Sequence, residues 1–347
     1  MSYYRKKMLI YAGAFNPPHK GHLKIVENAI KAISPDEIVV IIDKNPPWKN
    51  CFDLVPYSYR LTMMKNLFAN HFKYKVYENK ETFKFAVDIV LDIKYQYPNY
   101  DLYFLMGQDQ YDLFHTWKDY KIIEENLTIV MHPRSNDKAF EKNELKHIIL
   151  NSEHLPCSSS EIKTNLDVKY LGKKNFDFIK KNHLYLQYQI KNWMTKSRYE
   201  HSMRVYETAC FIAIKLGFND KEINQLQIAS LLHDVAKKMS DQEIKQCVSE
   251  EKIKTLPNIH CAHGIASATI AKNIFKVNDK IILEAIENHV IFNAYKNKIA
   301  KVLYCADKLE PSRTEQDIAN REGLLKLVCT DLDKGFEMVQ KSNLERY

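Results

Sequence analysis

The chain has few of the residues that mark linkers and disulfide scaffolds. It holds only 8 glycines and 11 prolines among 347 residues, so long disordered linkers are not expected. Its 7 cysteines are odd in number and scattered, and no CxxC pair occurs. This usage excludes a disulfide framework and indicates reduced thiols in a cytoplasmic protein.

Long hydrophobic runs and blocks of one charge are also missing. Residues 1–7 are polar, and the apolar run after them has only the length of a strand, so neither a secretory leader nor a membrane span is expected. The net charge of +8 is spread thinly, without a basic arm or a basic patch interleaved with aromatics. This charge suits anionic small molecules, and we expect no nucleic-acid and no membrane partner.

One ten-residue stretch organises the first half of the chain. Residues 8–12 have the pattern of a buried strand, and apolar residues recur at helical spacing over 23–33. The stretch between them, GAFNPPHKGH (13–22), places His19 and His22 on one face of the helix start. Backbone amides at a helix N-terminus, with two imidazoles beside them, suit a phosphate chain. The Gly-Lys-Ser/Thr ending of a P-loop is absent.

Strand patterns alternate with helical patterns throughout residues 1–187. This alternation predicts a Rossmann-like α/β domain, with a parallel sheet covered by helices on both faces. In such sheets, ligands bind at the carboxyl ends of the strands. The strands are expected at 8–12, 37–42, 74–77, 102–106 and 127–131, and helices after the first at 59–69 and 83–95.

Several polar residues of this half follow predicted strands or begin a helix. Asp109 and Arg134 each come shortly after a strand. In SSSEIK (158–163), Ser158 and Glu161 have the spacing of a capping box. Lys163 then adds a cation beside exposed helix amides, as a triphosphate would require.

These motifs resemble a known family. GAFNPPHKGH resembles the GxFxPxHxGH signature of Rossmann-like nucleotidyltransferases. Together with PPWK (46–49), the strand followed by MGQD (106–109) and Trp117, and SSSEIK, it resembles bacterial nicotinate-nucleotide adenylyltransferase over nearly all of residues 7–187. The resemblance implies adenylyl transfer from ATP, bound with Mg²⁺, to nicotinate mononucleotide. The acceptor phosphate attacks directly, so catalysis would consist of positioning and electrostatics.

The resemblance also implies roles for single residues. His19 and His22 would contact the ATP phosphates, and Trp117 would stack on the pyridine ring. The other implied nucleotide contacts are Gly13 and Phe15 of the signature, Thr82 and Asp109 at the nicotinate end, and Arg134, Ser159, Ser160 and Lys163 around ATP. The chain departs from the family pattern at Asn16 (often Asp), Trp48 (often His), Ser160 (Thr) and Lys163 (Arg). Since lysine lacks the bidentate fork of arginine, ATP binding would be weaker or differently tuned.

Strand patterns disappear in residues 188–347. Successive segments with a 3.6-residue period predict an all-α domain there. The expected helices are 199–216, 222–238, 240–250, 263–274, 280–290, 300–306 and 318–341.

The helical half contains a set of metal-ligand residue types. His233 and Asp234 are adjacent inside an apolar helical pattern, where burial would be costly without a partner. A metal ion supplies such a partner, and histidine with aspartate favours iron, manganese or zinc, as one or two ions. Separate helical segments carry the other candidates: His201, His263, His289 and Asp307. One ligand from each of several helices is typical of metal sites in bundle cores.

This half resembles the HD phosphohydrolase superfamily. HSMRVYETA, LLHDVAK, HGIASA, AIENH and YCADKLEPSR resemble, over residues 195–330, the bacterial HD hydrolases that cleave diadenosine tetraphosphate to two ADP. The resemblance implies one metal on His201, His233, Asp234 and Asp307, with His263 and His289 completing a second site. Asp234 would be catalytic, water activated by metal would attack a bridging phosphate, and Lys237 and Arg313 would contact phosphates.

The sequence therefore predicts a bifunctional enzyme with domains 1–187 and 188–347. Its expected partners are ATP, nicotinate mononucleotide and a dinucleoside polyphosphate. Nicotinamide mononucleotide or another phosphorylated acceptor stays open for the first domain. A 5′-nucleotidase, a guanosine alarmone hydrolase or a non-catalytic nucleotide sensor stays open for the second. The identity and number of the metal ions are also left open, and so is the oligomeric state, for which a homo-oligomer is one alternative.

Overall fold

The computed structural model describes residues 5–44, 54–69, 71–77, 85–133, 147–150, 157–314 and 316–344. Contacts divide the chain into two compact units, Met1–Phe178 and Ile179–Tyr347. Each unit is described by itself. The predicted domain boundary, between residues 187 and 188, falls inside the short helix α9 (Leu186–Gln189) and stays a prediction.

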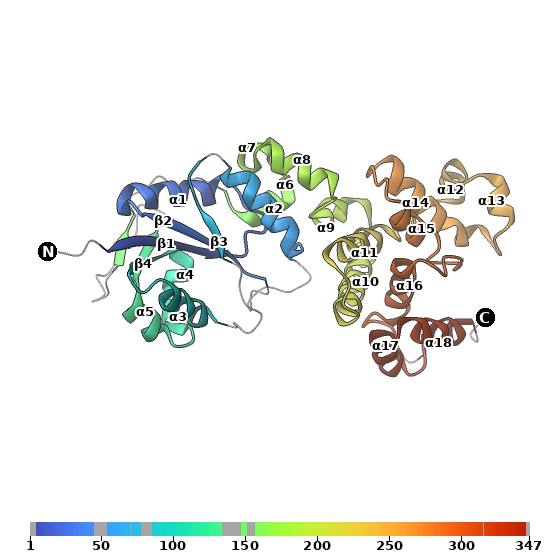
Figure 1. Ribbon diagram of the computed structural model, residues 1–347. Coiled ribbons are helices and arrows are strands. Elements are labelled where there is room, and N and C mark those ends of the chain that lie inside the picture. The colour runs from blue at the N-terminus through green and yellow to red at the C-terminus, as the bar shows by residue number, and fades with distance from the viewer. Residues whose placement is uncertain are drawn as a thin grey trace. The chain divides into compact units, whose positions relative to one another are not determined.

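The first unit is an α/β fold, as the sequence predicts (Figure 1). Its six strands are all parallel, in the order β3-β2-β1-β4-β5-β6. The strands are β1 (Lys6–Gly13), β2 (Glu37–Ile42), β3 (Lys75–Tyr77), β4 (Tyr100–Gly107), β5 (Thr128–His132) and β6 (His147–Ile149). The helices are α1 (Lys20–Ile33), α2 (Tyr57–Phe68), α3 (Ala86–Gln96), α4 (Gln108–Asp112), α5 (Tyr120–Asn126), α6 (Ser159–Asn165) and α7 (Val168–Leu171), and α8 (Lys173–Lys181) begins in this unit and ends in the next.

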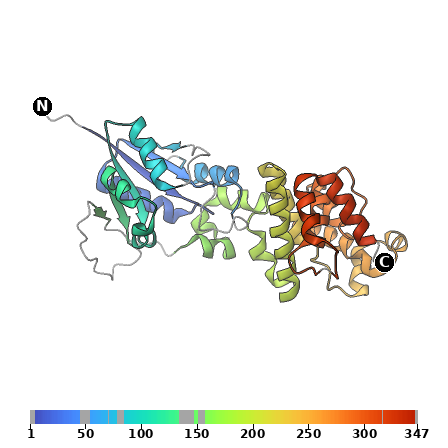
Figure 2. The same cartoon turned by 90° about the horizontal axis from the view of Figure 1, so that it is seen from below.

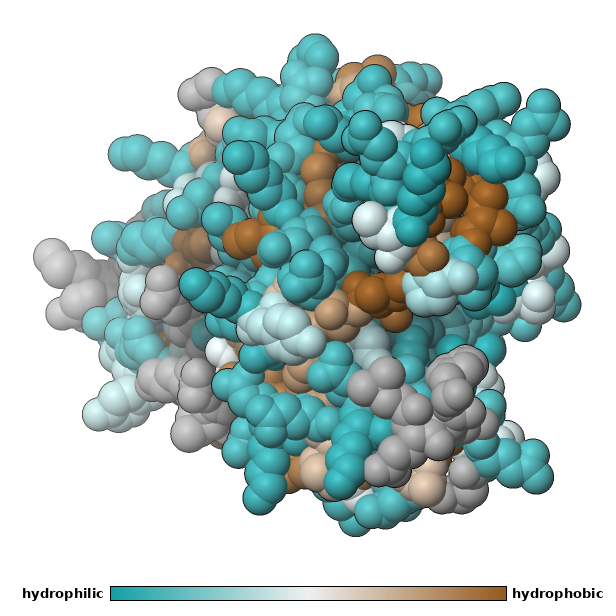
Figure 3. Space-filling model, turned by 90° about the vertical axis from the view of Figure 1, so that its right-hand side faces the viewer, coloured by the Kyte–Doolittle hydropathy of each residue, from teal (hydrophilic) through white to brown (hydrophobic). Residues whose placement is uncertain are grey.

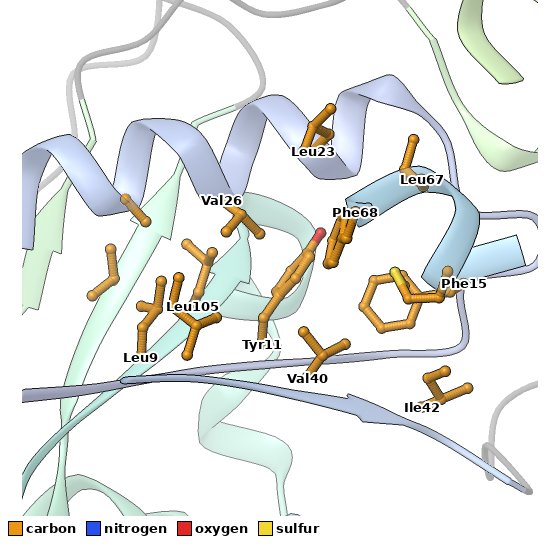
Figure 4. Close-up of a cluster of buried hydrophobic side chains, with 14 of the residues drawn as sticks. Leu9, Tyr11, Phe15, Leu23, Val26, Val40, Ile42, Leu67, Phe68 and Leu105 are labelled. Atoms are coloured by element: carbon orange, nitrogen blue, oxygen red, sulfur yellow. The ribbon is translucent and has the colours of Figure 1, made fainter. Parts of the chain in front are cut away.

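The central strand β1 is buried on both faces of the sheet. Its side chains alternate in direction, so Leu9 and Tyr11 pack in one core with α1 and α2. Met8 and Ile10 pack in a second core with α3 and α5, on the opposite side of the sheet (Figure 1). Figure 4 shows the first core, where Tyr11 lies among side chains of the neighbouring elements. Burial on both faces explains why the strands appear in the sequence as continuous apolar runs.

The strand order predicts a ligand site at the end of β1. The chain crosses from β1 to β2 on one side and reaches β4 on the other, so the sheet has a switch point between β1 and β4. Ligands of open α/β sheets bind at such a point, outside the carboxyl ends of the strands. Gly13 ends β1 and pairs with Ile42, while Gly107 ends β4 and pairs with His132.

The second unit is entirely helical among its described residues, as predicted (Figures 1 and 2). Its helices carry the candidate metal ligands on several separate elements. The helices are α9, α10 (Lys196–Lys215), α11 (Asp220–Leu232), α12 (Asp241–Cys247), α13 (Glu250–Lys254), α14 (His263–Asn273), α15 (Lys280–Glu287), α16 (Lys298–Leu309), α17 (Arg321–Thr330) and α18 (Leu332–Leu344), with 3₁₀ turns at Ile190–Trp193 and Ile259–Ala262.

The single helix predicted over 318–341 is wrong. The structure divides it into α17 and α18, which lie side by side in both views (Figures 1 and 2). Asp331 interrupts the helix with an extended backbone, and its Oδ1 accepts the Lys334 N–H at 3.1 Å, as a cap of α18. A Cβ on Gly335 would lie 2.6 Å from the Cα of Val328, so glycine allows the two helices to approach closely.

The helix predicted over 222–238 also ends earlier than expected, at Leu232. His233 is its C-terminal cap, and turns follow it to Lys238. His233 and Asp234 therefore lie at the end of a helix. In a continuous helix, neighbouring side chains point to different sides. The turn at this point instead allows the side chains of His233 and Asp234 to point toward the same cluster.

None of the described helices is both long and apolar enough to cross a bilayer. The face in Figure 3 is mostly hydrophilic, with separate hydrophobic areas. Single exposed apolar side chains such as Ile214 and Tyr295 are normal on a protein surface.

Candidate active sites

The two signature histidines form a reciprocal cap at the start of α1. His19 is the N-cap residue, and its Nδ1 accepts the Gly21 N–H at 3.1 Å. The Nδ1 of His22 accepts the His19 N–H at 3.1 Å. Each ring therefore satisfies one of the amides that a helix N-terminus leaves without a partner. A Cβ on Gly21 would lie 2.8 Å from the His19 ring, so only glycine leaves room for this arrangement.

The cap determines which ring nitrogen carries the proton. Since Nδ1 accepts a hydrogen bond in both rings, the proton of each neutral imidazole lies on Nε2. Burial lowers the pKa of His19 to about 4, so this ring is neutral at physiological pH. The ring centroids of His19 and His22 are 3.8 Å apart. The arrangement thus presents two Nε2–H donors at the positive end of a helix, which suits phosphate oxygens.

The helix α6 joins this site from far along the chain. The predicted capping box is confirmed, since Ser158 accepts the Glu161 N–H and the Glu161 carboxylate accepts the Ser158 N–H. Ser159 Oγ donates to the Pro17 carbonyl at 3.0 Å. Cys157, which the sequence analysis did not select, lies with its Sγ 3.5 Å from His19 Nδ1. The N-terminus of α6 therefore lies against the signature turn.

Other candidates of this site lie near the same edge of the sheet or outside the described residues. Lys163 is buried on α6, while Ser160 is exposed at its start. Asp109 is exposed on α4, directly after β4, and its Oδ1 would be 2.8 Å from a Cβ on Gly107. Trp117 packs edge-on against Phe114, with centroids 5.5 Å apart. Thr82, Arg134 and the PPWK segment (46–49) lie outside the described residues.

A buried arginine, not selected from the sequence, holds the signature loop. Arg60 of α2 is fully buried. Its Nη1 donates to the carbonyls of Ala14 and Asp43, each at 2.7 Å, and its Nε donates to the carbonyl of Val55 at 2.7 Å. Asn16 Oδ1 accepts the Val55 N–H at 3.2 Å, which adds a second link between the same segments. Arg60 therefore connects the signature loop, the end of β2 and the start of α2.

Replacing Arg60 by methionine should weaken adenylyl transfer strongly. The loop that carries His19 would lose its link to β2, and a displacement of about 1 Å in a positioned group costs on the order of 10²-fold in rate. Steady-state kinetics should show this loss in kcat/KM, with hydrolysis by the helical unit unchanged. Arg5→Met, at an exposed arginine of the same unit, is the control. A folded Arg60→Met protein with full synthetic activity would contradict this role.

The six predicted metal ligands meet in one buried cluster of the helical unit. Each is at most 7% exposed. His201 lies on α10, His263 begins α14 and Asp307 lies on α16, while His233, Asp234 and His289 follow the ends of α11 and α15. Asp234 Oδ1 is 3.2 Å from His263 Nε2 and 3.5 Å from His289 Nε2. Asp307 Oδ1 is 3.2 Å from His201 Nε2.

The four histidines all present the same nitrogen to the centre of this cluster. The Nδ1 of His233, His263 and His289 lies 2.7–2.8 Å from a backbone carbonyl three residues earlier. The Nδ1 of His201 lies 3.2 Å from a Glu310 oxygen. With Nδ1 engaged by an acceptor, Nε2 is the coordinating atom, as in metal sites generally. Within the described residues, the buried Nε2 atom of His233 has no hydrogen-bond partner, so the donor set fits a metal ion.

The two aspartates of the cluster are charged. Burial alone would raise the pKa of Asp234, but the adjacent His233 and hydrogen bonds from two further histidines hold it well below its usual range. Burial likewise opposes ionisation of Asp307, but Lys308 and His201 hold its pKa well below normal. Carboxylates and neutral imidazoles are the ligands that divalent first-row metals prefer. Ligand atoms of two groups lie within 4.8 Å of one another: His201, His233 and Asp307, and His233, Asp234 and His289.

Cations surround the cluster. Lys237 and Arg313, both selected from the sequence, contact it: Lys237 Nζ is 3.2 Å from His263 Nε2, and Arg313 Nη2 is 3.1 Å from Asp307 Oδ1. Two further cations were missed. Arg198 Nη1 donates to Asp234 Oδ2 at 2.6 Å, and Lys308 Nζ lies 2.5 Å from Asp307 Oδ2. Arg198 stands one helical turn before His201, a spacing that could have pointed to it.

Comparisons with known proteins assign each unit to a protein family. Residues 10–165 match the cytidylyltransferase-like family, and residues 198–312 match the HD domain. A probable nicotinate-nucleotide adenylyltransferase/Ap4A hydrolase of Mycoplasma genitalium is 29% identical over 347 residues, with 97% of each chain covered. A protein with the same name from Mycoplasma pneumoniae is 23% identical over 344 residues, with 96% of this chain and 98% of the relative covered. A probable nicotinate-nucleotide adenylyltransferase of Clostridium tetani is 31% identical over 198 residues, with 52% of this chain and 99% of the relative covered.

The fold and the two sites define a nucleotidyltransferase unit followed by an HD-domain unit that binds divalent metal. The chain belongs to the nicotinate-nucleotide adenylyltransferase family, and its helical unit is an HD domain. The family expectations of the sequence analysis are confirmed for both halves of the chain.

Proposed function

We propose that the α/β unit transfers the adenylyl group of ATP to nicotinate mononucleotide, and that the HD unit hydrolyses diadenosine tetraphosphate to two ADP. The observation that supports the first activity most strongly is the reciprocal histidine cap at the start of α1. The observation that supports the second is the buried cluster of six ligands surrounded by cations. The names of the full-length relatives support the pairing of the two activities.

The proposed synthesis requires no protein nucleophile. A phosphate oxygen of nicotinate mononucleotide attacks the α-phosphorus of ATP, and the bond from that phosphorus to the β-phosphate oxygen breaks. Pyrophosphate leaves, and nicotinic acid adenine dinucleotide remains. His19 and His22 would donate Nε2–H to the phosphates as charge builds at the α-phosphate, with Lys163 as a further cation. ATP would enter with Mg²⁺ between its phosphates. Asp109 and Trp117 would bind the nicotinate end, together with Thr82, while Arg134, Ser159 and Ser160 would bind ATP.

The proposed hydrolysis divides a tetraphosphate in the middle. Water attacks one of the two inner phosphorus atoms, and the central bridging P–O bond breaks. One ADP leaves with the bridging oxygen, and the attacked half becomes the second ADP by taking the oxygen of water, whose proton is released. A divalent ion, which we expect to be iron, manganese or zinc, would supply an activated water and Lewis acidity. His201, His233, Asp234, His263, His289 and Asp307 would hold one or two such ions. Lys237 and Arg313 would bind phosphate oxygens and neutralise the charge of the leaving ADP.

A substrate panel tests both assignments. For the first unit, nicotinate and nicotinamide mononucleotide should be compared at equal concentrations with Mg·ATP, with pyrophosphate release as the measurement. We expect the nicotinate acceptor to have the higher kcat/KM. For the HD unit, diadenosine tetraphosphate should be compared with AMP and a guanosine tetraphosphate alarmone. Faster turnover of AMP or of the alarmone would replace the proposed substrate, and no turnover by a metal-loaded protein would favour a nucleotide sensor.

A further inference from the structure

His201 differs from the other three ligand histidines in the group that faces Nδ1, the ring nitrogen that points away from the centre of the cluster. For His233, His263 and His289, that partner is a neutral backbone carbonyl. For His201, it is the carboxylate of Glu310, whose Oε1 lies 3.2 Å from Nδ1. Glu310 follows the end of α16 and is only 1% exposed. A buried carboxylate is costly unless its oxygens are well satisfied, so this one needs an explanation.

The surroundings of Glu310 consist of hydrogen-bond donors. Besides His201, its Oε1 accepts from Ser312 Oγ at 2.5 Å. Its Oε2 accepts from Arg204 Nε at 2.9 Å and from the Ser312 backbone N–H at 2.8 Å. Both oxygens therefore act as acceptors, which only a carboxylate can provide.

We propose that Glu310 is a positioning residue of the metal centre: it accepts the Nδ1 proton of His201 and so directs the Nε2 lone pair of that ring at the metal. The inference rests on the proposed metal centre and is independent of the substrate of the HD unit. It adds to the six ligands a residue that touches neither metal nor substrate. A carboxylate behind a ligand histidine fixes the tautomer and the ring orientation and makes the imidazole a stronger ligand.

A glutamine at this position cannot reproduce the arrangement. It offers one acceptor oxygen and one N–H₂ donor in place of two acceptors. If the oxygen keeps the bonds to Arg204 and Ser312, the N–H₂ group faces His201 Nδ1. The ring then carries its proton on Nε2, where it blocks coordination. If the amide is turned the other way, the N–H₂ group faces the donors of Arg204 and Ser312 without an acceptor.

If Glu310 had only a structural role, the variants would be expected to behave differently. Glu310 also ties the end of α16 to α10 through Arg204, with the ion pair at 2.9 Å. If this tie were its whole contribution, Arg204→Gln would have the same effect as Glu310→Gln. If Glu310 acts through His201, Arg204→Gln should leave metal binding nearly intact, because Ser312 and His201 still hold the carboxylate. Arg204 is thus a matched control.

The experiment measures metal binding and does not depend on turnover. Wild type, Glu310→Gln and Arg204→Gln are stripped of metal and titrated with Mn²⁺ and Zn²⁺, and bound metal is counted by elemental analysis. We expect metal affinity to fall about 10–100-fold in Glu310→Gln and to change little in Arg204→Gln. Adenylyl transfer and the unfolding temperature of the metal-free proteins serve as measures of folding. Equal metal binding by wild type and Glu310→Gln, or equal losses in both variants, would overturn the proposal.

If the Glu310→Gln protein does not fold, a second measurement, made on wild type, still tests the proposal. In zinc-loaded wild type, the four ligand histidines are observed by ¹⁵N NMR of their rings. His201 should have Nε2 on the metal and a proton on Nδ1, and that proton should resonate downfield of those of the other three rings, since its bond is charge-assisted. An unprotonated Nδ1 in His201 would overturn the proposal. Failure of wild type to bind any metal would instead remove the proposed metal centre itself.

Discussion

Replacing His19 by alanine should abolish adenylyl transfer and leave hydrolysis intact. The change removes an Nε2–H donor aimed at the phosphates, and the loss of one such preorganised donor costs about 10²–10³-fold in kcat. It also removes the acceptor for the Gly21 N–H, so half of the reciprocal cap is lost, while His22 keeps its bond from the backbone N–H of residue 19. We therefore expect a combined loss at or above the upper end of this range. Pyrophosphate release with Mg·ATP and nicotinate mononucleotide measures it.

The same protein provides an internal control for His19→Ala. Loss of a helix cap costs only about 1 kcal/mol, so the α/β unit should stay folded. Cleavage of diadenosine tetraphosphate by the HD unit should continue at the wild-type rate. His71→Ala, which removes a half-exposed histidine of the same unit, should change neither activity. Loss of both activities in a natively folded His19→Ala protein would contradict the assignment of two separate active sites.

Replacing Asp234 by alanine should abolish hydrolysis together with metal binding. Its two oxygens lie within 3.7 Å of the Nε2 atoms of all four ligand histidines, so it is the central anion of the cluster. Without it, the buried cluster keeps a single ligand carboxylate, Asp307. We expect metal content to fall below one half of the wild-type value and hydrolysis to fall at least about 10³-fold, in keeping with the several kcal/mol that a catalytic metal supplies.

The control for this change is an exposed aspartate of the same unit, Asp241→Asn at the start of α12. It should retain its metal and its hydrolytic rate. Adenylyl transfer should be unchanged in both variants. Retention of wild-type hydrolysis by Asp234→Ala would show that the buried cluster is not the hydrolytic site.

The elements that could be predicted from the sequence are those with a strong local signal. Strands buried on both faces, such as β1 and β2, form continuous apolar runs, and the signature at 13–22 lies between a strand and a helix. The proposed metal ligands could be selected because histidine and aspartate are uncommon at apolar helical positions. In each case, the residue type alone restricts the structure.

The residues that were missed depend on contacts made only in the fold. Arg60 lies in an ordinary helix, and the four carbonyls to which it donates, including that of Lys44, lie outside that helix. Glu310 and Arg198 are charged residues of the kind usually found in solvent. Only the approach of α10 to α16 places Glu310 beside His201, and only the approach of α10 to α11 places Arg198 beside Asp234. The break between α17 and α18 was missed because Asp331 lies within a continuous helical pattern, and the close approach of Gly335 to Val328 exists only in the fold.

The most direct test of the central claim, two activities in one chain, is the product pattern of diadenosine tetraphosphate cleavage. Wild type and His19→Ala, both loaded with metal, are incubated with the tetraphosphate, and the nucleotide products are separated over time. The account predicts ADP as the sole product, at the same rate in both proteins and abolished by removal of the metal. ATP together with AMP would show attack at a different phosphate, and no cleavage by the metal-loaded protein would contradict the proposed hydrolase.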